Sequence, residues 1–78
     1  KHGVSFETAQ KVFLDQRRVI SHDVKHSTES EARYFCFGMC AGVIITVRFT
    51  VRNDLIRIIG AGIWREGKRK YEEKNKIR

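Results

Sequence analysis

Hydrophobic and polar residues alternate along residues 43–59, VIITVRFTVRNDLIRII. Two runs rich in β-branched and aromatic residues flank a turn-prone Arg-Asn-Asp segment at 52–54, which predicts an antiparallel β-hairpin. Strand side chains point alternately to opposite faces of a sheet, so one face is expected to be apolar and the other to carry Arg48, Arg52 and Arg57. Three guanidinium groups on one surface repel each other and favour a polyanionic partner.

The remaining segments complete an α+β pattern. A stripe of apolar residues at helical spacing, from Phe6 to Phe13, predicts an N-terminal helix that begins after Ser5 and packs in the core. The other predicted elements are short strands over 18–21 and 31–37, a polar loop over 22–30, a turn over 38–42, a loosened glycine-rich segment over 60–62 and a final helix over 63–74. The sequence therefore predicts a small antiparallel sheet of three to four strands, with one helix near each end of the chain.

The composition is that of one small globular domain spanning residues 1–78, with 41% hydrophobic and 32% charged residues. No apolar run approaches the roughly 20 residues that span a bilayer, so no membrane segment is expected. The net charge of +7 and the pI near 9.9 favour nucleic acid or another acidic partner. The alternative, a basic protein with no such partner, is left open by charge alone.

Much of the positive charge lies in the predicted final helix. From residue 64 onward there are seven Lys or Arg residues and three Glu residues, so +4 of the net +7 lies there. A charged run of this kind is usually a solvated helix face. Here it accompanies aromatic residues that are able to stack on bases, which makes Arg65, Arg69 and Tyr71 candidates for RNA binding.

Cysteine and histidine suggest two kinds of chemistry. Cys36 and Cys40, taken with His22 and His26, form only loose CxxxC and HxxxH spacings, so reduced thiols in a cytoplasmic protein are favoured over a metal site. His26 lies in the predicted polar loop, where a histidine is more often simply exposed. It is nevertheless the preferred proton-transfer group, because histidine titrates near neutral pH without perturbation.

Four blocks of the chain resemble the BrnT toxins of bacterial toxin–antitoxin systems, which are similar to RelE ribonucleases. The blocks are KHGVSFETAQKVFLD, HSTESEARYFCFG, VIITVRFTVRNDLIRII and REGKRKYEE. The resemblance implies a RelE-like fold, endonucleolytic cleavage of RNA, and neutralisation by a BrnA-like antitoxin. Members of the family normally have a strand and most of a helix before the KHG block, so the domain is expected to be truncated at its N-terminus. An uncovered sheet edge would then favour a homodimer or a strand-exchanged oligomer.

Three positions depart from the family pattern. Gly62 stands where the family has an Arg suited to binding the scissile phosphate, Trp64 stands where it commonly has Thr, and Gly67 stands where it has Glu. The family pattern is retained at Lys68, Arg69, Tyr71 and Glu72. We therefore keep a second hypothesis open, in which the chain is a catalytically impaired toxin homologue that binds RNA or antitoxin without cleaving.

The residue types support a mechanism of RNA cleavage that needs no metal and no cofactor. RNA cleavage requires a base for the 2′-hydroxyl, cations for the phosphorane and an acid for the leaving oxygen. Our hypothesis assigns proton transfer to His26, with Asp54 in reserve although it is more typical of a turn. Phosphate binding is assigned to Arg52 and Arg57 with Arg48 behind them, and Lys68 or Arg69 reaches in from the last helix. DNA binding ranks third, because neither helix-turn-helix nor zinc-finger spacing is present.

Overall fold

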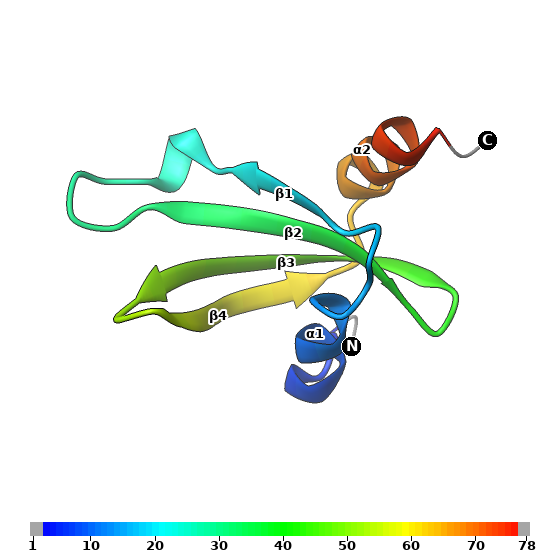
Figure 1. The fold of residues 1–78 in the computed structure, drawn as a ribbon, viewed down its shortest axis with the longest axis horizontal. Coiled ribbons are helices and arrows are strands. Elements are labelled where there is room, and N and C mark those ends of the chain that lie inside the picture. The colour runs from blue at the N-terminus through cyan, green and yellow to red at the C-terminus, as the bar shows by residue number, and fades with distance from the viewer. Residues whose placement is uncertain (1–2, 77–78) are drawn as a thin grey trace.

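The structure is a computed structural model that describes residues 3–76, and its course is shown in Figure 1. The elements in chain order are α1 (Phe6–Val12), β1 (Val19–His22), the 3-10 turn η1 (Val24–His26), β2 (Arg33–Cys40), β3 (Val43–Arg52), β4 (Leu55–Gly62) and α2 (Arg65–Asn75). The four strands form one antiparallel sheet in the order β1-β2-β3-β4. The predicted α+β class, with one helix near each end of the chain, is confirmed.

Two-residue turns join the long strands. Ala41-Gly42 connects β2 to β3, and Asn53-Asp54 connects β3 to β4. All four residues have positive φ values, between 53° and 80°. This backbone suits the twist of a tight hairpin and is adopted most readily by Gly, Asn and Asp. Asp54 is thus the turn residue that its sequence context favoured.

Three predicted boundaries were wrong, and strand pairing explains the first two. Gly38 belongs to β2, where it pairs with Ile45, so the turn occupies only Ala41-Gly42. The glycine-rich segment 60–62 continues β4 and pairs with β3, because the hydrogen-bonded ladder outweighs the low strand propensity of glycine. The last helix begins at Arg65, two residues later than predicted.

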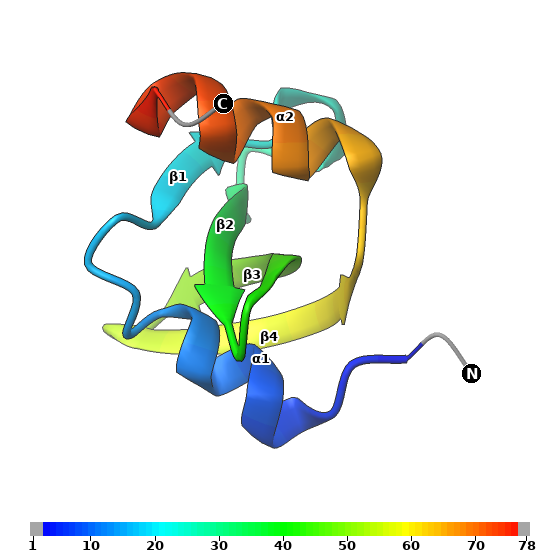
Figure 2. The ribbon, with the colours of Figure 1, turned by 90° about the vertical axis from the view of Figure 1, so that its right-hand side faces the viewer.

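The sheet is covered by one helix on each face, and Figure 2 shows α1 and α2 on opposite sides of it. On the α1 face, Ala9 and Val12 pack against buried strand residues, which are Cys36, Ile45, Val47 and Phe49. On the α2 face, a second cluster joins Tyr71 to Phe37 and Ile44. Each face of a half-buried sheet needs its own cover, and here two short helices provide it.

Each helix approaches the sheet over a glycine. A Cβ atom at Gly38 would lie 2.7 Å from both the side chain and the carbonyl oxygen of Val12, so α1 rests directly on β2. A Cβ atom at Gly67 would overlap Thr46 and the ring of Phe37, so α2 rests equally closely on β2 and β3. Close packing at Gly67 explains why this position carries no side chain.

A buried hydrogen bond fastens α2 to the rest of the chain. The hydroxyl of Tyr71 donates to Asp15 Oδ2 at 2.5 Å, and the same carboxylate accepts from the backbone N–H groups of Met39 and Arg17. Burial favours the protonated form of Asp15, but these three donors and the charge of Arg17 outweigh it and hold its pKa below the usual value. Burial and the bond to Asp15 raise the pKa of Tyr71 to about 12.

A β-bulge interrupts the ladder between β3 and β4. Arg48 pairs with Gly60 while the next residue, Phe49, pairs with Ile58, so Ile59 has no partner opposite it. The extra residue resets the alternation along β4. As a result Arg57 and Gly60 both lie on the α2 face, the same face as Arg48.

Candidate active site

An open cleft of about 460 Å³ lies on the α2 face, between the start of α2 and η1. Its walls come from separate parts of the chain, because η1 supplies His26, β3 supplies Arg48 and the residue before α2 supplies Trp64. Gly60 and Gly62 line the cleft from β4, and a Cβ atom built on either glycine would meet nothing within 4 Å. The cleft therefore exists because these two β4 positions lack side chains.

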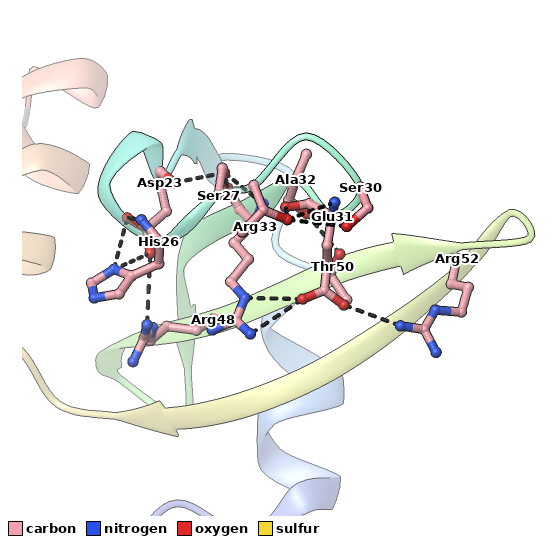
Figure 3. Close-up of polar contacts among 11 residues, drawn as sticks. Asp23, His26, Ser27, Ser30, Glu31, Ala32, Arg33, Arg48, Thr50 and Arg52 are labelled. Atoms are coloured by element: carbon pink, nitrogen blue, oxygen red, sulfur yellow. Dashed lines mark hydrogen bonds and ion pairs between the residues drawn. The ribbon is translucent and has the colours of Figure 1, made fainter.

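Asp23 holds His26, which lines this cleft. Figure 3 shows the contacts between the two residues. Asp23 caps η1 by accepting from the His26 backbone N–H at 3.3 Å. His26 Nδ1 lies 2.9 Å and 3.1 Å from the two oxygens of the same carboxylate. A carboxylate only accepts hydrogen bonds, so Nδ1 carries a proton, and in the neutral imidazole Nε2 then keeps a free lone pair. This is the arrangement of an imidazole prepared to accept a proton at Nε2.

The Asp23 carboxylate is only 5% exposed and also faces a guanidinium, since Arg48 Nη2 lies 3.7 Å from Asp23 Oδ2. Burial by itself would raise the pKa of Asp23. The hydrogen bonds and charge of His26, together with the charge of Arg48, outweigh burial and hold the pKa below its usual value. Asp23 is consequently ionised near neutral pH, and its carboxylate contacts both His26 and Arg48.

The other guanidiniums of this face lie along the sheet away from His26. Arg33 and Arg52 both bind Glu31, at 3.2 Å and 3.1 Å, as Figure 3 shows. Arg57, opposite Thr50 in the ladder, is exposed and forms no ion pair with any residue in 3–76. The three arginines predicted on one face of the hairpin are therefore together on that face, but two of them are paired with carboxylates.

The predicted catalytic arginines Arg52 and Arg57 lie beyond Arg48 along the hairpin, toward the β3–β4 turn. Arg52 is four residues beyond Arg48 on β3, which at roughly 3.3 Å per residue is about 13 Å. Arg57 sits near the same end of the hairpin. The structure thus brings together His26 and Arg48, while Arg52 and Arg57 form the outer part of the same surface.

The basic residues of α2 occupy different environments. Lys68 and Arg65 are exposed, and Lys68 lies one helical turn from Trp64 at the cleft. Arg69 is engaged by Glu66 and Glu73. Tyr71 is only 2% exposed and bonded to Asp15, so its ring is not accessible for stacking on a base in this structure.

Two important residues escaped the sequence reasoning about the site. Asp23 was not among the predicted site residues, although Asp three residues before His is the spacing of a capped turn. Trp64 was noted only as a departure from the family pattern, and it is 43% exposed in the cleft. The sequence signal for Trp64 was its position two residues after Gly62. Two glycines at the end of a strand leave space next to a large side chain, which indicates a cleft.

The cysteines lie apart from this site. Cys36 is fully buried on the α1 face, and burial raises the pKa of its thiol to about 11. Cys40 is half-buried and also free. Within residues 3–76, no three His, Cys, Asp or Glu side chains gather closely enough to hold a metal ion.

The structure is a small α+β protein in which an antiparallel meander lies between two helices, with an Asp–His pair and an arginine at an open cleft. Residues 1–70 match the family described as ribonuclease toxin, BrnT, of type II toxin–antitoxin systems, and the chain belongs to that family. No curated protein and no solved structure matches the chain significantly. Over residues 3–76, no helix combines the length and apolar character needed to cross a membrane.

Proposed function

We propose that this protein is an endoribonuclease that cleaves RNA without a metal ion, with Asp23, His26 and Arg48 at its centre. The observation that carries the proposal is the pairing of His26 Nδ1 with the Asp23 carboxylate at 2.9 Å, at the rim of a cleft lined by Arg48. Membership of a ribonuclease toxin family supports the reaction class.

In the proposed reaction, His26 Nε2 takes the proton from the 2′-hydroxyl, whose oxygen attacks the adjacent phosphorus. Asp23 orients the ring and stabilises the imidazolium that forms. Arg48 stabilises the negative charge of the phosphorane, a role suited to its planar fork of donors. Lys68, one turn from the cleft, is our candidate for protonating the 5′-oxygen as its bond to phosphorus breaks. The products are a 2′,3′-cyclic phosphate and a free 5′-hydroxyl.

The outer arginines are proposed to bind the flanking RNA. Arg33, Arg52 and Arg57 extend from Arg48 along one face of the sheet, which suits a backbone with a charge on every nucleotide. Arg65 and Arg69 add positive charge from α2. In this role the arginines increase affinity and salt dependence, and they contribute less to the chemical step.

Incubation with a defined RNA in EDTA tests the mechanism. Fragments ending in a cyclic phosphate are expected from the unaltered protein. His26→Ala should slow cleavage by roughly 10²- to 10⁴-fold, the usual contribution of a positioned acid or base. Arg48→Ala should also lose most activity, whereas Lys11→Ala, which removes an exposed cation of α1 on the other side of the sheet, is the matched control. Cleavage that persists unchanged in His26→Ala contradicts the assignment.

The double variant Arg52→Ala/Arg57→Ala separates binding from chemistry. It should raise KM more than it lowers kcat, and it should reduce the salt dependence of RNA binding by roughly two ion equivalents. Its thermal melt should stay close to that of the unaltered protein, because both side chains are exposed. If kcat alone collapses, the two arginines belong to the chemical step, as the sequence alone suggested.

Gly62 favours a second candidate function, an impaired toxin that binds RNA without cutting. The cleft has no cationic side chain at this position, and a Cβ there has open space. Gly62→Arg is therefore expected to fold normally and to place a guanidinium in the cleft. If the unaltered protein retains intact RNA and Gly62→Arg cleaves it, the impaired form is the correct description.

Family membership implies an antitoxin partner, and we propose that it is BrnA-like and that it neutralises the protein in the cytoplasm. Co-expression with the adjacent reading frame should relieve growth arrest and yield a stable complex. Homodimerisation is a further proposal, supported by β4, which pairs with β3 alone among the described strands. Light scattering of the pure protein tests it.

A further inference from the structure

The cleft has features beyond those that phosphate chemistry requires. Trp64 stands at one side of it, 43% exposed, with Phe35 packed on its ring at a centroid distance of 5.3 Å and Phe37 at 6.3 Å. A tryptophan supported in this way by two aromatic rings is held in place. Its uncovered surface borders the same cleft as His26 and Arg48.

The opposite side of the cleft is open because of glycine. Gly60 and Gly62 lie on the cleft side of β4, and neither has an atom within 4 Å of the position where a Cβ would sit. Neither has a positive φ, so backbone conformation does not require glycine at either position. The space they leave belongs to the same cleft that Trp64 lines.

Two residues that line the cleft each have a buried polar side-chain atom without a hydrogen-bond partner. Within the described chain, Thr46 Oγ1 and Arg48 Nε are the buried side-chain atoms that have no hydrogen-bond partner, and both residues line the cleft. Buried polar atoms are nearly always satisfied in native proteins, by the protein itself or by water or a ligand. Both unsatisfied atoms are thus found in residues of one cleft.

We propose that this cleft binds one nucleobase of the RNA, stacked on Trp64, next to the phosphate held at His26 and Arg48. The proposal deepens the nuclease function and rests on it for the identity of the ligand as RNA. Stacking on an aromatic ring is available to every base, and the cleft offers few polar groups to read a base edge. Selection therefore follows stacking area, and purines bind more tightly than pyrimidines.

The intrinsic fluorescence of the protein tests the proposal directly, because Trp64 is the only tryptophan in the chain. The probes are adenosine 3′,5′-bisphosphate, cytidine 3′,5′-bisphosphate and an abasic ribose bisphosphate, none of which contains a phosphodiester to cleave. The adenosine compound should quench Trp64 fluorescence and bind more tightly than the cytidine compound. The abasic compound should bind weakly, by calorimetry, and leave the fluorescence unchanged.

Three variants locate the base. Trp64→Ala should lower kcat/KM for RNA by roughly 5- to 140-fold, the range expected from the loss of one base–aromatic stack. Trp64→Phe keeps an aromatic ring against Phe35 and should recover most of that loss, which separates stacking from core packing. Gly62→Leu fills the cleft and should abolish quenching while Trp64 remains. Ile59→Leu, on the same strand outside the cleft, is the control.

The outcomes for the base site and for the nuclease are distinct. Cleavage of RNA without quenching by the adenosine compound, or quenching that survives in Gly62→Leu, overturns the base site and leaves the nuclease intact. Quenching without cleavage supports the base site and overturns the nuclease. His26→Ala should keep the quenching and lose the cleavage, which shows both functions separately in one variant.

Discussion

The two faces of the sheet share the same strands but form different surfaces. On the α1 face, successive inward residues of β3 are apolar, and Ala9 and Val12 close over them. On the α2 face, the apolar cluster consists of Phe37, Ile44 and Tyr71. Beyond Ile44, β3 carries the charged side chains of Arg48 and Arg52 toward the β3–β4 turn. Figure 1 shows α2 near one end of the long axis and the β3–β4 turn at the other.

The difference shows how a chain of this size accommodates a site. Because strand side chains alternate, each residue of β3 packed under α1 fixes the position of a neighbour on the other face. The α1 face thus supplies rigidity, and the α2 face uses it to hold Arg48 and the residues around it in register. Partial coverage by α2 leaves the cleft.

The largest effect should come from damage to the α1 face. Phe49 is 5% exposed, and its ring centroid lies 5.1 Å from that of Phe13 and 5.4 Å from that of Tyr34. Phe49→Ala should lower the free energy of unfolding by about 3–5 kcal/mol, measured by urea denaturation. Arg57→Ala, on the other face of the same hairpin, should change it by less than about 0.5 kcal/mol. Similar losses in both variants would mean that the two faces do not differ as described.

The bond between Tyr71 and Asp15 should give the next largest effect. Tyr71→Phe removes a hydrogen bond to a charged group, so the free energy of unfolding should fall by about 1.5–3 kcal/mol near neutral pH. Because folding raises the pKa of Tyr71 to about 12, this stabilisation is fully present below pH 10, the ordinary tyrosine value, and is lost as pH rises toward 12. Thermal melts of both proteins across that range should therefore converge.

Gly67 and Gly62 both belong to the α2 face, yet they should respond differently to the same change. Gly67→Ala places a Cβ against Thr46 and Phe37 and should destabilise the protein by about 1–3 kcal/mol. Gly62→Ala places its Cβ in open space and should leave the melting temperature nearly unchanged. A loss of stability in Gly62→Ala would show that the cleft is filled by other side chains in solution.

The smallest expected effect concerns Glu31, which engages Arg33 and Arg52 near the outer end of the charged surface. Glu31→Gln removes a negative charge and releases both guanidiniums. RNA affinity should rise by up to about five-fold, the equivalent of the roughly 1 kcal/mol that such an exposed pair contributes. Filter binding at low salt measures it, and unchanged affinity would exclude these arginines from the RNA surface.

Local pattern was sufficient for most of the fold. Alternation at 43–59 predicted the central hairpin, and helical spacing from Phe6 predicted α1, because these periods reflect which side of an element is buried. The resemblance of four blocks to BrnT indicated the family, which the match over residues 1–70 shows. The errors fell at Gly38 and at Gly60 to Gly62, where pairing with β3 overrides the local preference of glycine for turns.

The candidate site depended on contacts that sequence does not state. His26 was identified from its chemistry alone, but its partner Asp23, the opposing Arg48 and the neighbouring Trp64 come from three separate segments that meet only when the sheet and α2 are in place. The β-bulge after Arg48 also decided which β4 residues share its face. The order of residues thus determined the strands, the helices and the charge of this protein. Tertiary packing decided which charged side chains form ion pairs and which do not, because ion pairs and burial depend on neighbours distant in the chain.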